Sequence, residues 1–274
     1  MEDDGKVYIA PSLFVNHGGG PNPVLGEKNN LEIAKSLKEV QKVVDLTRLK
    51  AIILVTAHWE ADQVSISTNE HHDLLFDYYN FPPESYKYKY EGRGDPELAR
   101  NIHDALTKAQ INSRLDNERG WDHGVFIPMM LMRPEADIPI VQVSILYNQD
   151  AKLHYNIGKV LREFRKKGVA VIGSGLSYHN MRRLKACRTE KNEYIENREF
   201  DDFLSGVCTS DEAIREKIIH WKEASGALDC HPDGEADHLM PLIVAAGAGG
   251  NSKGRKVFET AFYNRFLLSN LLWE

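Results

Sequence analysis

The sequence predicts an α/β fold, in which a single domain has a central sheet, mostly parallel or mixed, flanked by helices. Short apolar runs rich in β-branched residues, such as 52–57 and 169–172, are typical of buried strands. Amphipathic stretches with helical periodicity lie between them, and this alternation favours a sheet covered by helices. No linker, repeat or low-complexity tract divides the 274 residues, so we expect residues 1–274 to form one domain.

The first elements can be assigned in order. A strand ends near residues 14–16, and a glycine-rich loop follows it. Apolar residues at helical spacing then predict a helix over 30–46, and the run 52–57 predicts the second strand. The apolar face of this helix comprises Leu31, Ala34, Leu37, Val40 and Val44.

The same alternation continues through the middle of the chain. Asp95 is a suitable N-cap and Pro96 a suitable first residue for a helix over 96–109. The alternating run 139–145 then predicts another strand. The second helix of the chain therefore connects two strands, as the α/β arrangement requires.

In the second half of the chain, Asp150 is the N-cap of a strongly amphipathic helix that Gly168 closes before the strand 169–172. Residues 185–236 are polar and charged, and we interpret them as an excursion from the same domain. Helical pieces are expected at 192–206, 211–224 and, after this excursion, 239–246.

Composition argues against several classes of function. A net charge of -6 is unfavourable for a general binder of nucleic acid or of anionic membranes. No run approaches the roughly 18 apolar residues of a membrane helix, and the acidic first residues are unlike the basic start of a signal peptide. Cys187, Cys208 and Cys230 lack paired spacing and indicate free thiols in a reducing compartment. We therefore expect a cytoplasmic protein that binds neither nucleic acid nor membrane.

Five histidines give the clearest indication of chemistry. His17, His58 and His179 follow predicted strands, and ligands in α/β sheets bind beyond the carboxyl ends of the strands. His123 and His238 also lie beside small or turn-forming residues. Imidazole is a common metal ligand and the usual proton carrier near neutral pH. A lone histidine is more often structural, but several at strand ends predict a metal or acid–base site.

Five short motifs that contain these histidines occur in a specific order. They are His17-Gly18-Gly19-Gly20-Pro21, Thr56-Ala57-His58-Trp59, Trp121-Asp122-His123-Gly124, the turn Gly175 to Asn180, and Asp237-His238-Leu239-Met240-Pro241-Leu242. Over residues 11–250 the chain resembles the class III extradiol ring-cleaving dioxygenases, the LigB-like family, and most closely its DOPA 4,5-dioxygenase branch. The charged stretch after Asn180, rich in lysine and glutamate, departs from the pattern of the family. This difference concerns the residues that form the substrate pocket.

The resemblance implies a catalytic domain that cleaves the ring of a DOPA-like catechol with O2 and forms a semialdehyde. It implies His17, His58 and His238 as metal ligands, His179 as the acid–base group and His123 as a second histidine near oxygen or a substrate hydroxyl. The resemblance also allows His179 to be a fourth ligand. We expect Fe(II) in the active enzyme, because three protein ligands leave open positions for substrate and O2. Zn(II), which is redox-inert, suits the same ligands and can occupy the isolated protein.

Two other interpretations come from different classes. The Memo signalling proteins resemble this family in fold, so a non-catalytic binding protein with a metal site is one alternative. A serine esterase is the other, since His17-Gly18-Gly19-Gly20 and Gly175-Leu176-Ser177-Tyr178-His179 resemble an oxyanion motif and a nucleophile elbow. The esterase interpretation is weakened because the elbow lacks its final glycine.

Overall fold

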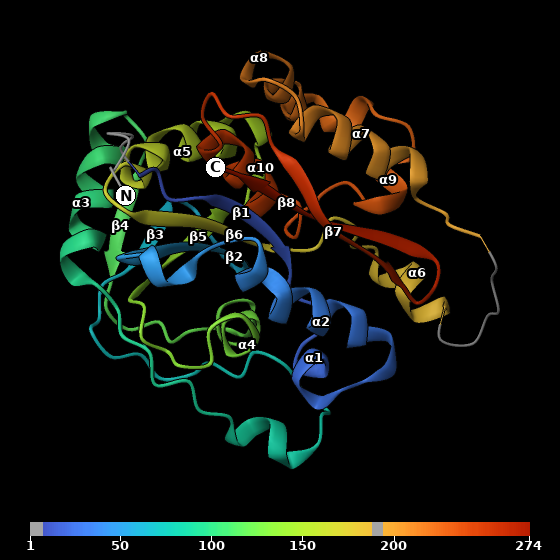
Figure 1. The fold of residues 1–274 in the computed structure, drawn as a ribbon, viewed down its shortest axis with the longest axis horizontal. Coiled ribbons are helices and arrows are strands. Elements are labelled where there is room, and N and C mark those ends of the chain that lie inside the picture. Colours follow the sequence, from blue (N-terminus) through green and yellow to red (C-terminus); the bar gives the residue numbers. More distant parts are fainter. Residues whose placement is uncertain (1–7, 188–193) are drawn as a thin grey trace, which may run out of the picture.

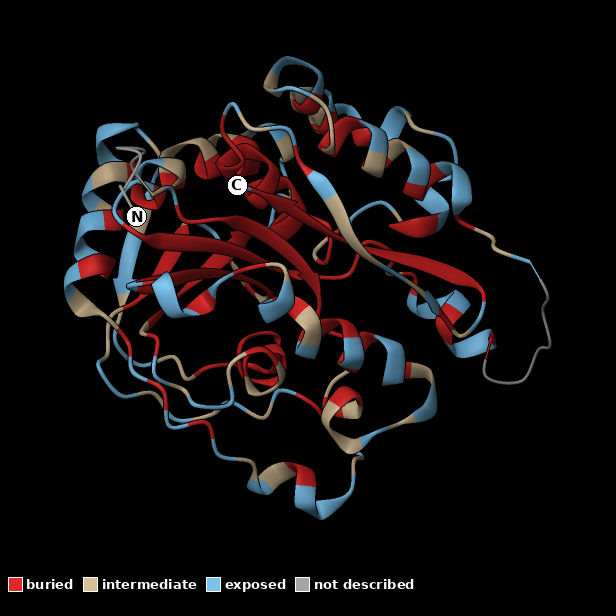
Figure 2. Ribbon diagram, in the orientation of Figure 1, coloured by how far each residue is buried: buried red, intermediate tan, exposed pale blue. Residues whose placement is uncertain are grey.

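The structure is a computed structural model that describes residues 8–187 and 194–274. In this part of the chain one eight-stranded mixed sheet, in the order β4-β3-β5-β2-β6-β1-β8-β7, forms the centre of the molecule (Figure 1). Helices lie on both of its faces, and most strands form the buried interior, whereas β4 and β7 at the two edges are largely exposed or half-buried (Figure 2). The predicted α/β class and single mixed sheet are confirmed.

The centre of the sheet consists of four parallel strands. They are β1 (Ser12–Asn16), β6 (Val169–Gly175), β2 (Ala51–Ala61) and β5 (Ile140–Leu146). Nearly every residue in them is buried, which explains their continuous apolar sequence, because helices cover both faces of a parallel sheet. Their carboxyl ends therefore lie along one edge of the molecule, where the site described below is found.

Shorter and antiparallel strands complete the two sides of the sheet. Beyond β5, β3 (Val64–Ser67) runs antiparallel to it and pairs in parallel with β4 (Ser113–Asp116). On the other side a hairpin of β7 (Arg255–Phe262) and β8 (Phe266–Trp273) pairs with β1 through β8. This hairpin was not predicted from the sequence.

Two helices pack tightly against one face of the parallel strands. They are α5 (Ala151–Arg165) and α10 (Met240–Ala248), which lie against each other and against β6. A Cβ atom at Gly158 would lie 2.1 Å from the carbonyl oxygen of Val244, and one at Gly247 would lie 2.2 Å from that of Tyr155. Glycine at these two positions therefore allows the two backbones to approach closely.

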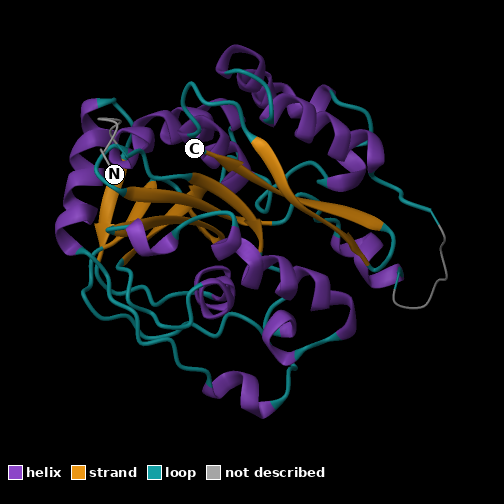
Figure 3. Cartoon of the chain, viewed as in Figure 1, coloured by secondary structure: helices purple, strands orange, loops and turns teal. Residues whose placement is uncertain are grey.

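The opposite face and the ends of the sheet carry the remaining helices (Figure 3). Next to each other on the opposite face lie α2 (Leu31–Glu39) and α4 (His123–Met132), and α3 (Pro96–Lys108) packs near β3 and β4. The short helices are α1 (Asn22–Leu25), α6 (Met181–Ala186), α8 (Glu212–Arg215) and α9 (Ala227–Cys230), with 3-10 turns η1 (Lys28–Asn30), η2 (Val40–Lys42), η3 (Leu46–Arg48), η4 (Pro83–Lys87) and η5 (Glu216–Glu223).

Several predicted boundaries require correction. The helix expected over 30–46 ends at Glu39, because the chain tightens into the 3-10 turn η2 and Asp45 then caps the separate turn η3. The first two residues of the piece expected at 192–206 lie outside the described residues, and α7 covers Arg198–Cys208. The piece expected at 211–224 is divided into α8 and η5. Within the described residues no helix combines the length and the apolar character needed to cross a membrane.

His154 is a structural histidine that makes the stability of this fold depend on pH. It is buried in α5, where its Nδ1 donates to the carbonyl of Asp150 at 2.7 Å and its Nε2 accepts from the amide of Leu146 at 3.0 Å. Burial lowers the pKa of His154 from 6.5 to about 4. The unfolded chain therefore binds a proton between these two values that the folded protein does not, and stability falls as the pH decreases through this window.

We expect His154→Gln to reduce this acid sensitivity. The loss of unfolding free energy between pH 7 and pH 5 should be smaller in the variant by about 2 kcal/mol, the linkage contribution of one such group. Urea denaturation of both proteins at the two pH values measures this difference. An equal loss in both proteins would contradict the assignment.

Candidate metal centre

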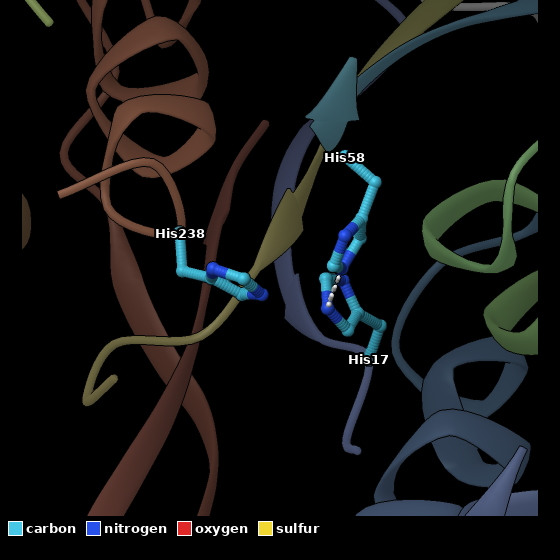
Figure 4. Close-up of side chains that lie close together, drawn as sticks. All are labelled: His17, His58 and His238. Atoms are coloured by element: carbon cyan, nitrogen blue, oxygen red, sulfur yellow. Dashed lines mark hydrogen bonds between the residues drawn. The ribbon is translucent and has the colours of Figure 1, made fainter. Parts of the chain in front are cut away.

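The five histidines singled out from the sequence lie together at the carboxyl edge of the parallel strands. His17 follows β1, His58 lies in β2, and His179 lies in the loop after β6. His123 begins α4, and His238 precedes α10. The ring centroids of His17, His58 and His238 are 4.8–5.2 Å apart. Figure 4 shows these three rings facing a common space.

One nitrogen from each of these three histidines can reach a single ion. The three ligand atoms lie within 4.8 Å of one another, and the Nε2 atoms of His17 and His58 are 3.2 Å apart. At metal–nitrogen distances of about 2.0–2.1 Å, two adjacent ligand nitrogens lie about 2.9–3.4 Å apart for octahedral to tetrahedral angles. The separation of His17 and His58 thus suits two ligands of one metal ion.

Hydrogen bonds determine which nitrogen of His17 faces the centre. The hydroxyl of Ser174, in β6, donates to the carbonyl of Gly124, so its oxygen is free to accept from Nδ1 of His17 at 3.0 Å. His17 therefore carries its proton on Nδ1 and directs the lone pair of Nε2 toward His58. The Nδ1 of His58 lies 3.6 Å from a carboxylate oxygen of Asp77, which likewise favours a proton on Nδ1. Two lone pairs thus face each other, an arrangement that a cation stabilises.

His58 does not lie at the end of its strand, because β2 continues to Ala61. The pairing of β2 with β6 stops at Thr56, and its register with β5 shifts between Val55 and Glu60. This irregularity interrupts the regular pleat where His58 turns toward the centre. The end of the regular apolar run was predicted correctly, and the continuation of the strand to Ala61 was not predicted.

A buried carboxylate, Asp122, supports the backbone around His58. It accepts hydrogen bonds from Thr56 Oγ1 at 2.7 Å, Gln142 Nε2 at 2.8 Å and Arg119 Nη2 at 3.1 Å. Arg119 also donates to the carbonyl of His58 at 2.8 Å, and Thr56 Oγ1 accepts from the amide of His58 at 3.2 Å. The position of His58 therefore depends on a polar network beneath the strand.

His238 is held by its neighbour and by a close backbone contact. Its Nδ1 lies 2.7 Å from Asp237 Oδ2, so Nε2 is left to face the centre. A Cβ atom at Gly175 would lie 2.2 Å from the carbonyl oxygen of His238, and that carbonyl accepts from the amide of Leu176 at 3.1 Å. Glycine at the end of β6 therefore permits the approach that brings His238 to His17 and His58.

His179 and His123 lie on two sides of this three-histidine group. The ring of His179 stacks on that of His238 with centroids 3.5 Å apart, and the ring of His123 lies 3.8 Å from that of His58. His123 Nδ1 is 2.8 Å from Asp77 Oδ1, whereas His179 Nδ1 is 3.7 Å from Asp237 Oδ1. The structure therefore brings both predicted acid–base histidines next to the proposed ligands.

The electrostatics of the group also suit a divalent cation. Burial, together with the neighbouring imidazoles, lowers the pKa of His17 and of His58 well below its usual range, and lowers the pKa of His238 to about 4. These rings are thus neutral near pH 7, the form that binds metals. Burial alone would raise the pKa of Asp77 and of Asp237, but the adjacent histidines lower both. Two carboxylates therefore remain charged beside neutral imidazoles, and their charge balances that of a 2+ ion.

A cavity of about 630 Å³ opens onto the histidines. Its walls contain the aromatic residues Tyr78, Tyr79, Phe81, Phe262 and Tyr263, the glycines 18–20, and Lys185. The cavity has room for a single aromatic ring with a substituent, with the histidines His58, His123, His179 and His238 at its base.

The position of Ser177 argues against the esterase interpretation. Ser177 is 2% exposed and does not line the cavity. Its Oγ accepts from the amide of Ser269 at 3.0 Å, so this hydroxyl faces β8 and lies apart from an open substrate site. The glycines after His17 do line the cavity, and Gly18 has a φ of 82°, which is strained in other residues.

Three residues that hold the histidines were not predicted from the sequence. Asp237 directly precedes His238, and the Asp–His pair was a usable signal for it. Ser174 lies in β6, where its hydroxyl has no distinguishing pattern. Asp77 lies in an irregular loop, 46 positions before His123, and only the folded chain places the two side chains together.

Comparison with known proteins gives consistent matches. The family model of the catalytic LigB subunit of aromatic ring-opening dioxygenase matches residues 11–268. The dioxygenase tasH of Hapsidospora irregularis is 40% identical over 258 residues, which cover 89% of this chain and 79% of that protein. The 4,5-DOPA dioxygenase extradiol of Beta vulgaris is 34% identical over 259 residues, 92% of each chain.

A solved structure extends this comparison to the fold. An uncharacterized protein from Escherichia coli K12 superposes with a TM-score of 0.77 at 24% identity, covering 97% of this chain and 100% of that one. The likeness shows that the eight-stranded sheet and its helices form a fold found in another protein.

Proposed function

Because the chain belongs to the family of the catalytic LigB subunit of aromatic ring-opening dioxygenases, we propose that it is a metal-dependent extradiol dioxygenase acting on a DOPA-like catechol. The observation that carries the proposal is the convergence of His17, His58 and His238 beneath an aromatic-lined cavity. The curated relatives named 4,5-DOPA dioxygenase extradiol support this substrate class. The product would be a semialdehyde, formed with both atoms of O2.

The three histidines would hold one metal ion through their Nε2 atoms. When bound, Fe(II) supplies the redox chemistry and the open coordination positions that O2 and a catechol require. Zn(II) would occupy the same ligands in the isolated protein and would be inactive in this reaction, since it is redox-inert. Asp77 and Asp237 provide the negative charge that offsets either ion.

The remaining residues would bind the substrate and move its protons. Tyr78 and Phe81 lie on one wall of the cavity, so an aromatic ring can pack against them. His179 would accept a proton from a catechol hydroxyl and later return it to an oxygen of the product as the ring opens. His123 lies close to His58 and would face the second hydroxyl or the oxygen.

One feature of the cavity supports a substrate with an acidic substituent. Lys185, in α6, is the one lysine or arginine lining the cavity among the residues that the structure describes. A catechol that carries a carboxylate, as DOPA does, would place the negative charge of that carboxylate near Lys185.

Ring cleavage is tested by loading the metal-free protein with Fe(II) without oxygen and then adding catechols and air. We expect oxygen uptake with the appearance of a yellow semialdehyde, because the site supplies neutral histidines and an intradiol enzyme typically uses Fe(III) with tyrosinate ligands. Zn(II)-loaded protein is the matched control and should consume no oxygen. A colourless dicarboxylate as the main product would exclude extradiol cleavage. Partner binding without turnover would favour the Memo-like alternative.

A further inference from the structure

Two carboxylates flank the proposed metal centre in related positions. Asp77 lies between His58 and His123, and Asp237 lies between His238 and His179. Each carboxylate therefore faces the Nδ1 atom of one proposed metal ligand and of one histidine that is not a ligand in the three-histidine set. Both side chains are mostly buried, with 19% and 21% of their side-chain area exposed.

The distances show that the two carboxylates hold different histidines. Asp237 Oδ2 is 2.7 Å from Nδ1 of the proposed ligand His238, while its Oδ1 is 3.7 Å from His179. Asp77 shows the reverse preference. Its Oδ1 is 2.8 Å from Nδ1 of His123 and accepts the His123 amide at 3.0 Å, while its Oδ2 is 3.6 Å from His58.

We propose that Asp237 and Asp77 are positioning residues with separate duties, Asp237 for metal binding through His238 and Asp77 for holding His123 toward the second substrate hydroxyl or the oxygen. The inference rests on the proposed function, because it takes His17, His58 and His238 as the metal ligands. A carboxylate bonded to a ring Nδ1–H fixes the tautomer and the orientation of the ring and increases the basicity of Nε2. At His238 that nitrogen faces the metal position. At His123 it belongs to a residue that lines the substrate cavity.

The two aspartates are matched controls for each other. In Asp237→Asn we expect metal affinity to fall about 10–100-fold, the usual effect of losing a carboxylate behind a histidine ligand. In Asp77→Asn we expect a smaller loss of metal affinity, about threefold or less, because this change removes a negative charge near the ion but its hydrogen bond is to His123, outside the ligand set. Competition between protein and a chromophoric chelator for Zn(II) measures both affinities without any turnover.

The second readout is turnover with saturating Fe(II) and catechol. Asp77→Asn should lower kcat at least about tenfold, within the range of a misplaced acid–base group. In the His123→Gln background the same change should have no further effect, since Asp77 acts through His123. A purely structural role would slow both backgrounds alike. Exposed Asp104, replaced by Asn, serves as the control for an uninvolved carboxylate.

Three results would overturn the proposal. They are equal losses of Zn(II) affinity in the two aspartate variants, a full kcat in Asp77→Asn, and a further loss of kcat on adding Asp77→Asn to His123→Gln. If an Asn variant fails to fold, judged by circular dichroism, the pair of Asp→Ser variants is compared instead. Failure of the proposed function has a different signature, namely wild-type protein loaded with Fe(II) that forms no ring-cleaved product. The Zn(II) measurement then still decides whether Asp237 and Asp77 differ.

Discussion

His58→Ala is expected to remove nearly all tightly bound metal from the protein. The Nε2 of His58 lies 3.2 Å from that of His17, and its loss leaves two of the three proposed ligands. The two imidazoles that remain, those of His17 and His238, do not complete the site of an ion that needs at least three protein ligands in an open catalytic site. Metal content after reconstitution and removal of loosely bound ions, measured by elemental analysis, should fall from about one ion per chain to nearly none.

A histidine far from the centre serves as the control for this experiment. His220 lies in η5 with 62% of its side chain exposed, and His220→Ala should retain the full metal content. The variant His58→Ala should also remain folded, because the alanine keeps the backbone bonds to Arg119 and Thr56. Stoichiometric metal in folded His58→Ala would show that the ligands are other residues.

His179→Ala is expected to keep most of the metal and to slow turnover by roughly 10²–10⁴-fold, the usual contribution of a positioned acid–base group. Its ring stacks on His238 at the base of the cavity, but its Nδ1 is 3.7 Å from Asp237 and makes no hydrogen bond to any residue that the structure describes. The ring of His179 is therefore less constrained than the rings of the three proposed ligands. It can accept a proton from the substrate in the cavity and return it later in the reaction. Metal content and kcat, measured on the same preparation, test both parts.

Each alternative outcome for His179 has a definite meaning. Loss of the metal in His179→Ala would make His179 a fourth ligand. Normal metal content with nearly wild-type turnover would transfer the proton-carrying role to His123, which already has a carboxylate partner in Asp77. His179→Gln separates the effect of the imidazole from the loss of a side chain that packs on His238.

Elements with strong local signals were predictable from the sequence. The carboxylates of Asp95 and Asp150 accept from the amides three residues later, so both predicted helices begin where their caps indicated. The strand expected at 169–172 is β6, extended to Gly175. The histidines converge because β2, which contains His58, and the strands β1 and β6, which precede His17 and His179, are parallel neighbours in the sheet.

Features that depend on distant contacts were not predictable. The hairpin β7–β8 is stabilised by pairing of β8 with β1, more than 250 residues earlier in the sequence, and the apolar run 266–273 carries no local sign of that partner. Asp77 lies in a loop whose sequence has no hydrophobic periodicity, and its hydrogen bond with His123 forms only in the folded chain. In both cases the deciding contact exists only in the folded chain, where burial and hydrogen bonding override local preference.

The origin of the product oxygens tests the central claim most directly. Protein loaded with Fe(II) is mixed with a catechol and ¹⁸O2, and the product is reduced at once with borohydride, because aldehyde oxygens exchange with water. A ring-cleaving dioxygenase places both atoms of one O2 molecule in the product, so mass spectrometry should detect two ¹⁸O atoms in each product molecule. A product without ¹⁸O, or an oxidised catechol whose ring is intact, would contradict the proposed function.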